Sequence, residues 1–312
     1  MAASERKYSE FRHPRQMLGD QEYDGHLSIH DDQMAEDLGF SGAPIEGPTH
    51  FSQFVHLLHD YFGDAWFERG CISAHYQNMV VEGEEVRAFV EVPLEQASLT
   101  RIGAEKRDGT PVLTGTASVG PEYGETEIDQ RLGRLRPAEQ LVILSDLEVG
   151  QQGAGNPEEA IMDFDQNMGA LYPFSLAEKL GCITETHSYY TNEGASSSPW
   201  SRPVIPLEMI SVLASYNNRS GFKTRGPAVG LFAGQEIRMI KGPLFVNQPY
   251  NIEREIVALS ESRRTESNWI KSNVIDADSG DLVCTMILNS ATLKDSYANY
   301  EQDALALGKS LA

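Results

Sequence analysis

The chain has 312 residues, of which 40% are hydrophobic and 23% are charged, and its formal net charge is −21. This hydrophobic content is enough for a buried core and excludes disorder as the main state, while the length predicts two domains or one double-sized unit. The acidic balance excludes nucleic acid and anionic membrane surfaces as partners, because neutralising phosphate groups requires a basic face.

Cysteine usage and hydropathy narrow the class of protein further. Cys71, Cys182 and Cys284 lie far apart, which matches no metal-binding motif, and their odd number argues against a disulfide framework. No segment approaches the 18 or so consecutive apolar residues of a membrane-spanning helix, and the polar start lacks the apolar core of a signal peptide. We expect a cytoplasmic protein without a metal ion or a cofactor.

The first strong pattern is a helix that begins near Gly47. Pro48 suits the first helical turn, where its missing N–H is not needed, and Gly63 suits the end. Between them, apolar residues recur at helical spacing: Phe51, Phe54, Val55, Leu58 and Phe62. The pattern predicts a buried helix of about four turns.

A run of β-strands follows this helix, and the same order returns later in the chain. Strands are predicted at 72–80, 86–92, 100–106 and 112–119, with an Asp108-Gly109 hairpin turn before the last one. The second series begins with the apolar helical run LEMISVLASY after Pro206, and its strands are predicted at 229–241, 249–258, 265–276 and 281–293.

The offset between the two series is roughly 160–170 residues, about half of the chain. We therefore predict an α+β protein made of two diverged copies of one unit, each with a long central helix wrapped by a curled antiparallel sheet. The first copy covers residues 1–125, a charged connector covers 126–148, and the diverged second copy covers 149–312.

This duplicated pattern looks like the double hotdog, and one segment narrows the resemblance. Residues 26–54 (HLSIHDDQMAEDLGFSGAPIEGPTHFSQF) resemble the MaoC-like, (R)-specific enoyl-CoA hydratase and dehydratase group. The residues that match the order of its motif are His30, Asp32, Ala35, Gly39-Phe40, Pro44-Ile45 and Gly47, and VVEGEEV at 80–86 is similar to the sheet turn of that family.

Three positions depart from the family motif. The Asn-Pro of the family is Leu27-Ser28 here, the position expected for its Asp falls on Gly25 with Asp24 one residue away, and Glu46-Gly47 stands where the family usually has His-Gly. The resemblance implies a hydro-lyase that adds or eliminates water at a double bond conjugated to a carbonyl, with a small-molecule substrate such as a CoA thioester.

Seven of the eight histidines precede residue 76, which places the expected site in the first copy. Such a reaction needs a base and an acid, and a His near a carboxylate can exchange protons near neutral pH. We take His30 as one member of the catalytic pair and Asp24 as its more favoured partner. The alternative is that His30, Asp31 and Asp32 only precede and cap a helix over 32–38.

Further candidates lie at the start of the predicted central helix. The unpaired amides at a helix amino end can polarise a carbonyl oxygen, and the resemblance implies this role for the region of Gly47. Glu46 is either an additional catalytic base or a partner of the helix dipole. Thr49 and His50 are candidate substrate contacts. The alternative for His50 is a histidine buried in the core.

A basic loop stands out in this acidic chain. Arg219, Lys223 and Arg225 could clamp the phosphates of a CoA-type ligand, or they could simply balance neighbouring acids in solvent. Trp200 could close over a pocket. His56 and His59 have helical spacing but no third metal ligand, which favours an ordinary surface face.

Two other functions remain open at this point. A thioesterase, or another lyase on a non-CoA substrate, would use Glu46 to activate water. A catalytically degenerate hotdog would act as a ligand-binding or scaffold subunit. In each case we expect the two copies to form a pseudo-dimer within one chain, which can pair again as a homodimer.

Overall fold

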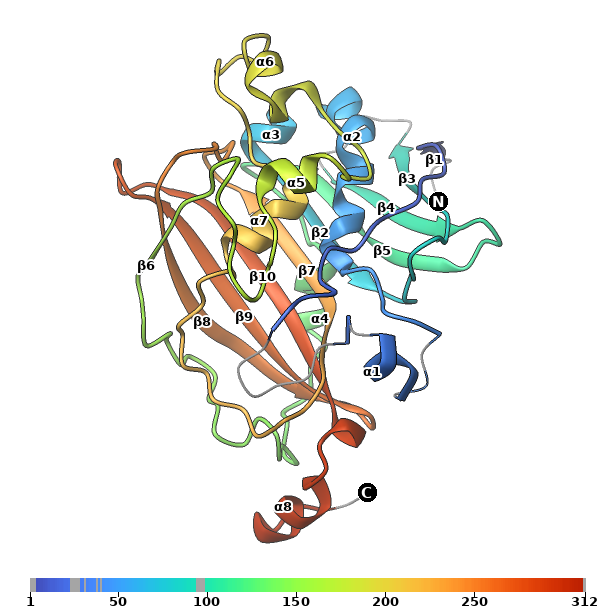
Figure 1. Cartoon of the computed structure of the whole chain (residues 1–312), viewed down its shortest axis with the longest axis vertical. Helices are drawn as coiled ribbons and strands as arrows, with labels where there is room; N and C mark the ends of the chain where they lie inside the picture. Colours follow the sequence, from blue (N-terminus) through green and yellow to red (C-terminus); the bar gives the residue numbers. More distant parts are fainter. Residues whose placement is uncertain are drawn as a thin grey trace.

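A computed structural model describes residues 4–22, 29–30, 32–37, 39, 41–93 and 99–310. Ten strands in these ranges form one antiparallel sheet with the order β1-β3-β4-β5-β2-β7-β10-β9-β8-β6 (Figure 1). The strands are β1 (Ser4–Tyr8), β2 (Gly70–Tyr76), β3 (Val86–Pro93), β4 (Leu99–Lys106), β5 (Pro111–Val119), β6 (Glu158–Ala160), β7 (Gly230–Met239), β8 (Tyr250–Glu261), β9 (Thr265–Asp276) and β10 (Leu282–Leu293).

The strand order has a two-fold pattern. Strands β1-β3-β4-β5-β2 form one half, and β6-β8-β9-β10-β7 repeat the same order from the other edge. The halves join where β2 pairs with β7, in a register that runs from Cys71 opposite Arg238 to His75 opposite Gly234. The eight strands predicted from alternation are confirmed, whereas β1 and the three-residue β6 were not predicted.

The helix predicted after Gly47 is present and has two parts. A 3₁₀ segment, η1 (Gly47–Phe54), continues into α2 (Val55–Phe62), which ends at Gly63 with a φ of 63°. Tight 3₁₀ turns are common where a helix starts. In the second half, α7 (Leu207–Leu213) has only seven residues and stops before the end of the predicted apolar run. Segment η1 contacts α7 as well as β3 and β7.

The remaining helices are short and lie in the connections between strands or, for the last two, after the final strand. None of the helices in the described ranges is long and apolar enough to cross a membrane. They are α1 (Asp32–Asp37), α3 (Ala65–Arg69), α4 (Glu127–Leu132), α5 (Leu176–Leu180), η2 (Ser188–Tyr190), α6 (Asn192–Ala195), η3 (Lys294–Ser296) and α8 (Tyr300–Ala306).

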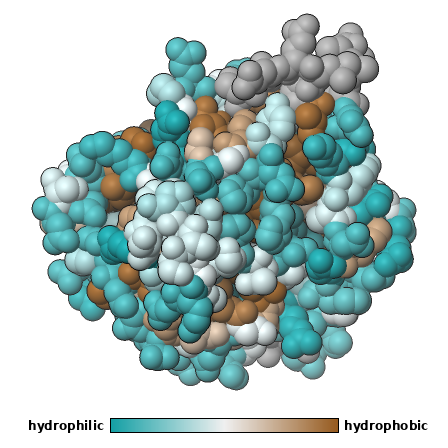
Figure 2. Space-filling model, turned by 90° about the horizontal axis from the view of Figure 1, so that it is seen from above, coloured by the Kyte–Doolittle hydropathy of each residue, from teal (hydrophilic) through white to brown (hydrophobic). Residues whose placement is uncertain are grey.

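The main hydrophobic core extends through both halves. Phe51, Phe54 and Leu58 of the first helix belong to the same buried cluster as Met209 and Ile210 of α7. Hydrophilic residues dominate the face seen in Figure 2, with apolar residues showing in small groups between them. The halves are therefore joined both by a continuous sheet and by a shared interior.

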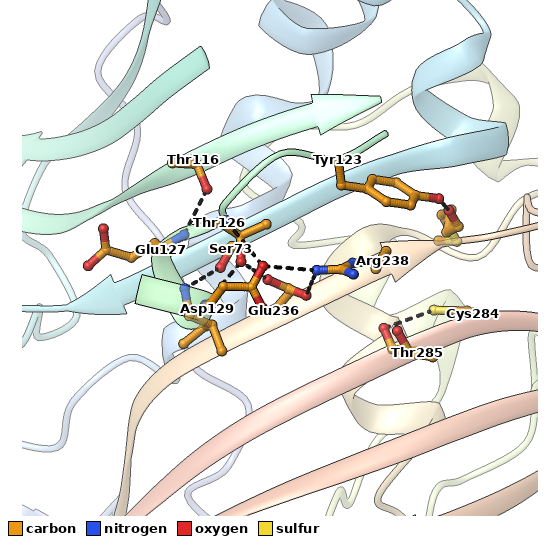
Figure 3. Close-up of polar contacts among 12 residues, drawn as sticks. Ser73, Thr116, Tyr123, Thr126, Glu127, Asp129, Glu236, Arg238, Cys284 and Thr285 are labelled. Carbon is orange, nitrogen blue, oxygen red and sulfur yellow. Dashed lines mark hydrogen bonds and ion pairs between the residues drawn. The ribbon is translucent and has the colours of Figure 1, made fainter. Parts of the chain in front are cut away.

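Helix α4 is fixed on the β2–β7 seam by buried polar contacts (Figure 3). Thr126, the N-cap of α4, donates to the Glu236 carboxylate at 2.5 Å and accepts from the Asp129 N–H. Arg238 pairs with Glu236 at 2.7 Å, and Ser73 accepts from an α4 backbone N–H at 2.9 Å. Because Glu236 is only 2% exposed, these donors are what makes its burial tolerable.

Candidate functional site

A cavity of about 410 Å³ opens at the amino end of η1. Four candidates from the sequence line it: His30, Glu46, Gly47 and His50. The opposite part of its lining comes from the second half, namely β7, β9, β10 and the loop after α7. Its volume falls in the range of small-molecule sites.

His30 is held in one tautomer by the backbone. Its Nδ1–H donates to the Pro44 carbonyl oxygen at 2.8 Å, so in the neutral ring Nε2 carries the lone pair that accepts a proton. Burial lowers the pKa of His30, which keeps the ring neutral near pH 7. The preceding Ile29 packs on Val229 and Leu293 of the second half, so both halves position this imidazole.

Glu46 is the residue immediately before η1, and its carboxyl group is partly neutral at pH 7. Burial raises the pKa of Glu46 to about 7, against the opposing effects of Lys179 and of a hydrogen bond from Tyr172. Tyr172 Oη donates to Glu46 Oε1 at 3.2 Å. A carboxyl group that titrates near neutral pH can both donate and accept a proton.

A buried ion pair lies near Glu46 and affects its titration. Lys179 of α5 pairs with Glu208 of α7 at 2.9 Å, and the two side chains are 6% and 2% exposed. Lys179 lowers the pKa of Glu46, whereas Glu208 raises it. The sequence analysis missed Tyr172, Lys179 and Glu208. Each lies more than 125 residues after Glu46 in the chain and belongs to no recognisable motif.

Gly47 leaves room for the Tyr76 ring and presents its amide at the start of η1. A Cβ at position 47 would lie 2.4 Å from that ring. Pro48 has no N–H, and the Thr49 N–H donates to the Glu46 carbonyl oxygen at 3.1 Å. The Gly47 N–H makes no hydrogen bond within the described part of the chain, so it is a donor available at the cavity.

His50 is a buried, neutral ring in the cavity lining. It is 2% exposed, and burial lowers its pKa to about 4. Its Nδ1 makes no hydrogen bond to any residue that the structure describes. A polar atom buried in this way is a candidate ligand contact, since leaving it unpaired is unfavourable.

The other sequence candidates lie elsewhere. Asp24 is outside the described residues, and Thr49 is buried without lining the cavity. Trp200 packs edge-on against Phe67 and Tyr189.

Thr224 of the basic loop lines the cavity, but the three cations of this loop do not. Arg225 pairs with Asp303 at 3.1 Å and with Asp146 at 3.7 Å. Lys223 is exposed, and Arg219 borders a separate shallow depression. None of the three cations is therefore part of the cavity lining.

His56 and His59 form an aromatic cluster with His187. His56 Nε2–H donates to the Thr186 carbonyl oxygen at 2.7 Å, and His59 contacts His187 at 3.1 Å and Asp64 at 3.1 Å. No group of three or more His, Cys, Asp or Glu side chains among the described residues is arranged to hold a metal ion.

Comparison with solved structures shows what this fold is similar to. A conserved hypothetical protein from Mycobacterium tuberculosis, described as a double hotdog, aligns over 84% of this chain and 86% of its own with a TM-score of 0.50 and 10% identity. This chain has the double hotdog fold.

Two further solved structures are similar at lower scores. A protein described as a MaoC domain dehydratase, from Chloroflexus aurantiacus, aligns over 85% of this chain and 86% of its own, with a TM-score of 0.49 and 12% identity. A MaoC-like dehydratase aligns over 84% of this chain and 87% of its own, with a TM-score of 0.48 and 14% identity. No protein-family model and no curated protein matches the chain.

Proposed function

We propose that the protein is a hydro-lyase that adds or eliminates water at a double bond conjugated to the carbonyl of an acyl thioester. One observation carries the proposal: a neutral imidazole, His30, and a carboxyl group with a pKa of about 7, Glu46, line the same cavity at a helix amino end. The motif resemblance around His30 and Gly47 supports the same reaction class.

The residues divide the chemistry as follows in the hydration direction. Nε2 of His30 takes a proton from water as the oxygen forms a bond to the β-carbon. The π electrons move toward the carbonyl, and protonated Glu46 delivers a proton to the α-carbon. The Gly47 N–H donates to the carbonyl oxygen, where negative charge develops. Dehydration runs through the same steps in reverse.

The proposed site lies in the first of two copies. We place this copy at residues 1–125, the connector at 126–148 and the second copy at 149–312, so that the copies form a pseudo-dimer within one chain. The palindromic strand order and the shared core support this division.

The test is the His30→Ala variant, assayed with enoyl thioesters by the loss of the conjugated enone absorbance. Turnover should fall by about two to four orders of magnitude, because a general base is removed. His56→Ala is the matched control, since His56 is an exposed histidine that does not line the cavity. Full activity of His30→Ala would refute the assignment.

A thioesterase is the second candidate, because Glu46 at the amino end of η1 could activate water for attack on the carbonyl itself. Product analysis separates the two functions. A thioesterase releases free thiol from saturated and unsaturated substrates alike, whereas a hydro-lyase leaves the thioester intact. Thermal stabilisation by acyl thioesters without either product would favour a binding subunit.

A further inference from the structure

The part of the cavity formed by the second half carries a polar cross-strand pair next to an apolar one. Asn268 of β9 and Ser290 of β10 are direct cross-strand partners, and both line the cavity. The adjacent pair on the same face, Ile270 and Leu288, is apolar. Thr292, two residues beyond Ser290, also lines the cavity and extends the polar region.

These polar side chains take no part in the hydrogen bonding of the described protein. Asn268, Ser290 and Thr292 are half-buried, and their side chains make no hydrogen bond to any described residue. The pairing of β9 with β10 uses the backbones of these residues and does not need their side chains. Groups with this arrangement are satisfied by water or by a ligand.

Their position in the sheet separates them from the Gly47 end of the cavity. Tyr76 of β2 contacts the Gly47 end of the cavity, and β7 and β10 lie between β2 and β9. The two strand spacings to Ser290 and the three to Asn268 correspond to roughly 10 and 14 Å along the sheet. A substrate whose carbonyl lies at Gly47 would therefore reach the polar pair with the distal part of its acyl chain.

The charge of the cavity limits what that distal part can be. No lysine or arginine lines the cavity in the described ranges, whereas the Glu46 carboxyl group does. An anionic tail would be buried without a counter-ion, which is costly. The Asn amide and the Ser hydroxyl can each donate and accept a hydrogen bond, so they suit a neutral oxygen.

We infer, on the basis of the proposed function, that the substrate carries an uncharged oxygen, a hydroxyl or a ketone, on its acyl chain remote from the thioester, and that Asn268 and Ser290 bind it. This gives the site a preference for oxygenated acyl chains over plain alkyl chains and over chains that end in a carboxylate. The apolar Ile270–Leu288 pair accommodates the intervening methylene groups.

The experiment measures binding without turnover, by calorimetry of the full chain with saturated S-(2-oxoalkyl) pantetheine thioethers. These keep a carbonyl oxygen for the Gly47 N–H but have neither a double bond to hydrate nor a thioester to hydrolyse. A homologous series of chain lengths is compared with a terminal methyl, hydroxyl or carboxylate group. At the optimal length, the hydroxyl ligand should bind about tenfold more tightly than the methyl ligand, and the carboxylate ligand most weakly.

Asn268→Ala and Ser290→Ala should each reduce the preference for hydroxyl over methyl toward one, without weakening the methyl ligand. Asn273→Ala is the matched control: Asn273 is on the same strand but does not line the cavity, so the preference should persist. Equal binding of the hydroxyl and methyl ligands by the unmodified protein, or tightest binding of the carboxylate, overturns this inference alone. Binding of none of the ligands overturns it together with the proposed thioester site.

Discussion

The ion pair between Lys179 and Glu208 gives a quantitative test of how the region around Glu46 is built. At 2.9 Å and an effective dielectric constant of 20, the attraction is about 6 kcal/mol, but most of it offsets the loss of hydration of two nearly unexposed charges. Lys179→Met keeps the apolar stem and removes the charge, so Glu208 is left buried without its counter-ion. The expected loss is about 3–5 kcal/mol of the free energy of unfolding.

Urea denaturation measures this loss, as a lower midpoint at an unchanged m-value. The exposed pair Lys241–Asp281 provides the control, because its contact is similarly short at 2.7 Å but its side chains are 62% and 48% exposed. Lys241→Met should cost less than about 1 kcal/mol. The double variant Lys179→Met/Glu208→Leu should recover most of the stability, because no unpaired charge remains.

The reasoning fails if Lys179→Met is no more destabilising than Lys241→Met, or if the double variant is as unstable as the single one.

The same ion pair gives a second prediction, in which its two members shift the pKa of Glu46 in opposite directions. Because Lys179 lowers the pKa of Glu46 and Glu208 raises it, Lys179→Met should move the Glu46 titration to higher pH and Glu208→Gln should move it to lower pH. Carboxyl infrared bands measure both, and shifts in the same direction would contradict the proposed arrangement.

Three further predictions concern single substitutions. The pKa of Glu46 is about 7 in the folded state and 4.5 ordinarily, so the wild type should lose stability as pH rises from about 4.5 to 7. Glu46→Gln should remove this loss, so that it is about 3 kcal/mol more stable than the wild type above pH 7 and unchanged near pH 4, which urea titrations at each pH can check. Gly47→Ala should cost about 1–3 kcal/mol of the free energy of unfolding, because the new Cβ meets the Tyr76 ring. This ring is held in place by its hydroxyl group, which donates to Gln235 at 3.2 Å. An unchanged midpoint in thermal or urea unfolding would contradict this contact. Thr126→Val should cost about 1–3 kcal/mol in the same assay, because it removes both the N-cap of α4 and a donor to Glu236, and a neutral result would show that the seam does not depend on that contact.

The sequence predicts the regular elements well, because alternation and helical spacing are local signals. The eight strands and the helix from Gly47 to Phe62 follow from residues that are close in the chain. Strand β6 was not predicted, because three residues are too short for alternation to be seen. The 3₁₀ form of η1 also has no distinct side-chain pattern.

The candidate site was only partly predictable, because its electrostatics depend on distant residues. His30, Glu46, Gly47 and His50 were all selected from one segment, and all four line the cavity. The counter-ions of the charged candidates could not be predicted from neighbouring residues in the sequence. The sequence left two roles open for the basic loop, a phosphate clamp or the balancing of neighbouring acids. Arg225 has the second role, but nothing near it in the sequence indicates that Asp146 and Asp303 are its partners.

The β2–β7 pairing means that both halves of this sheet are encoded by a single polypeptide. In an assembly of identical subunits, a substitution in one subunit is present in every other subunit as well. Here the short α7 and the polar pair on β9 and β10 belong to the second half only, and His30 lines the same cavity from the first half. Covalent linkage thus allows one half to diverge while the segment that carries His30 and Glu46 in the other half stays unchanged.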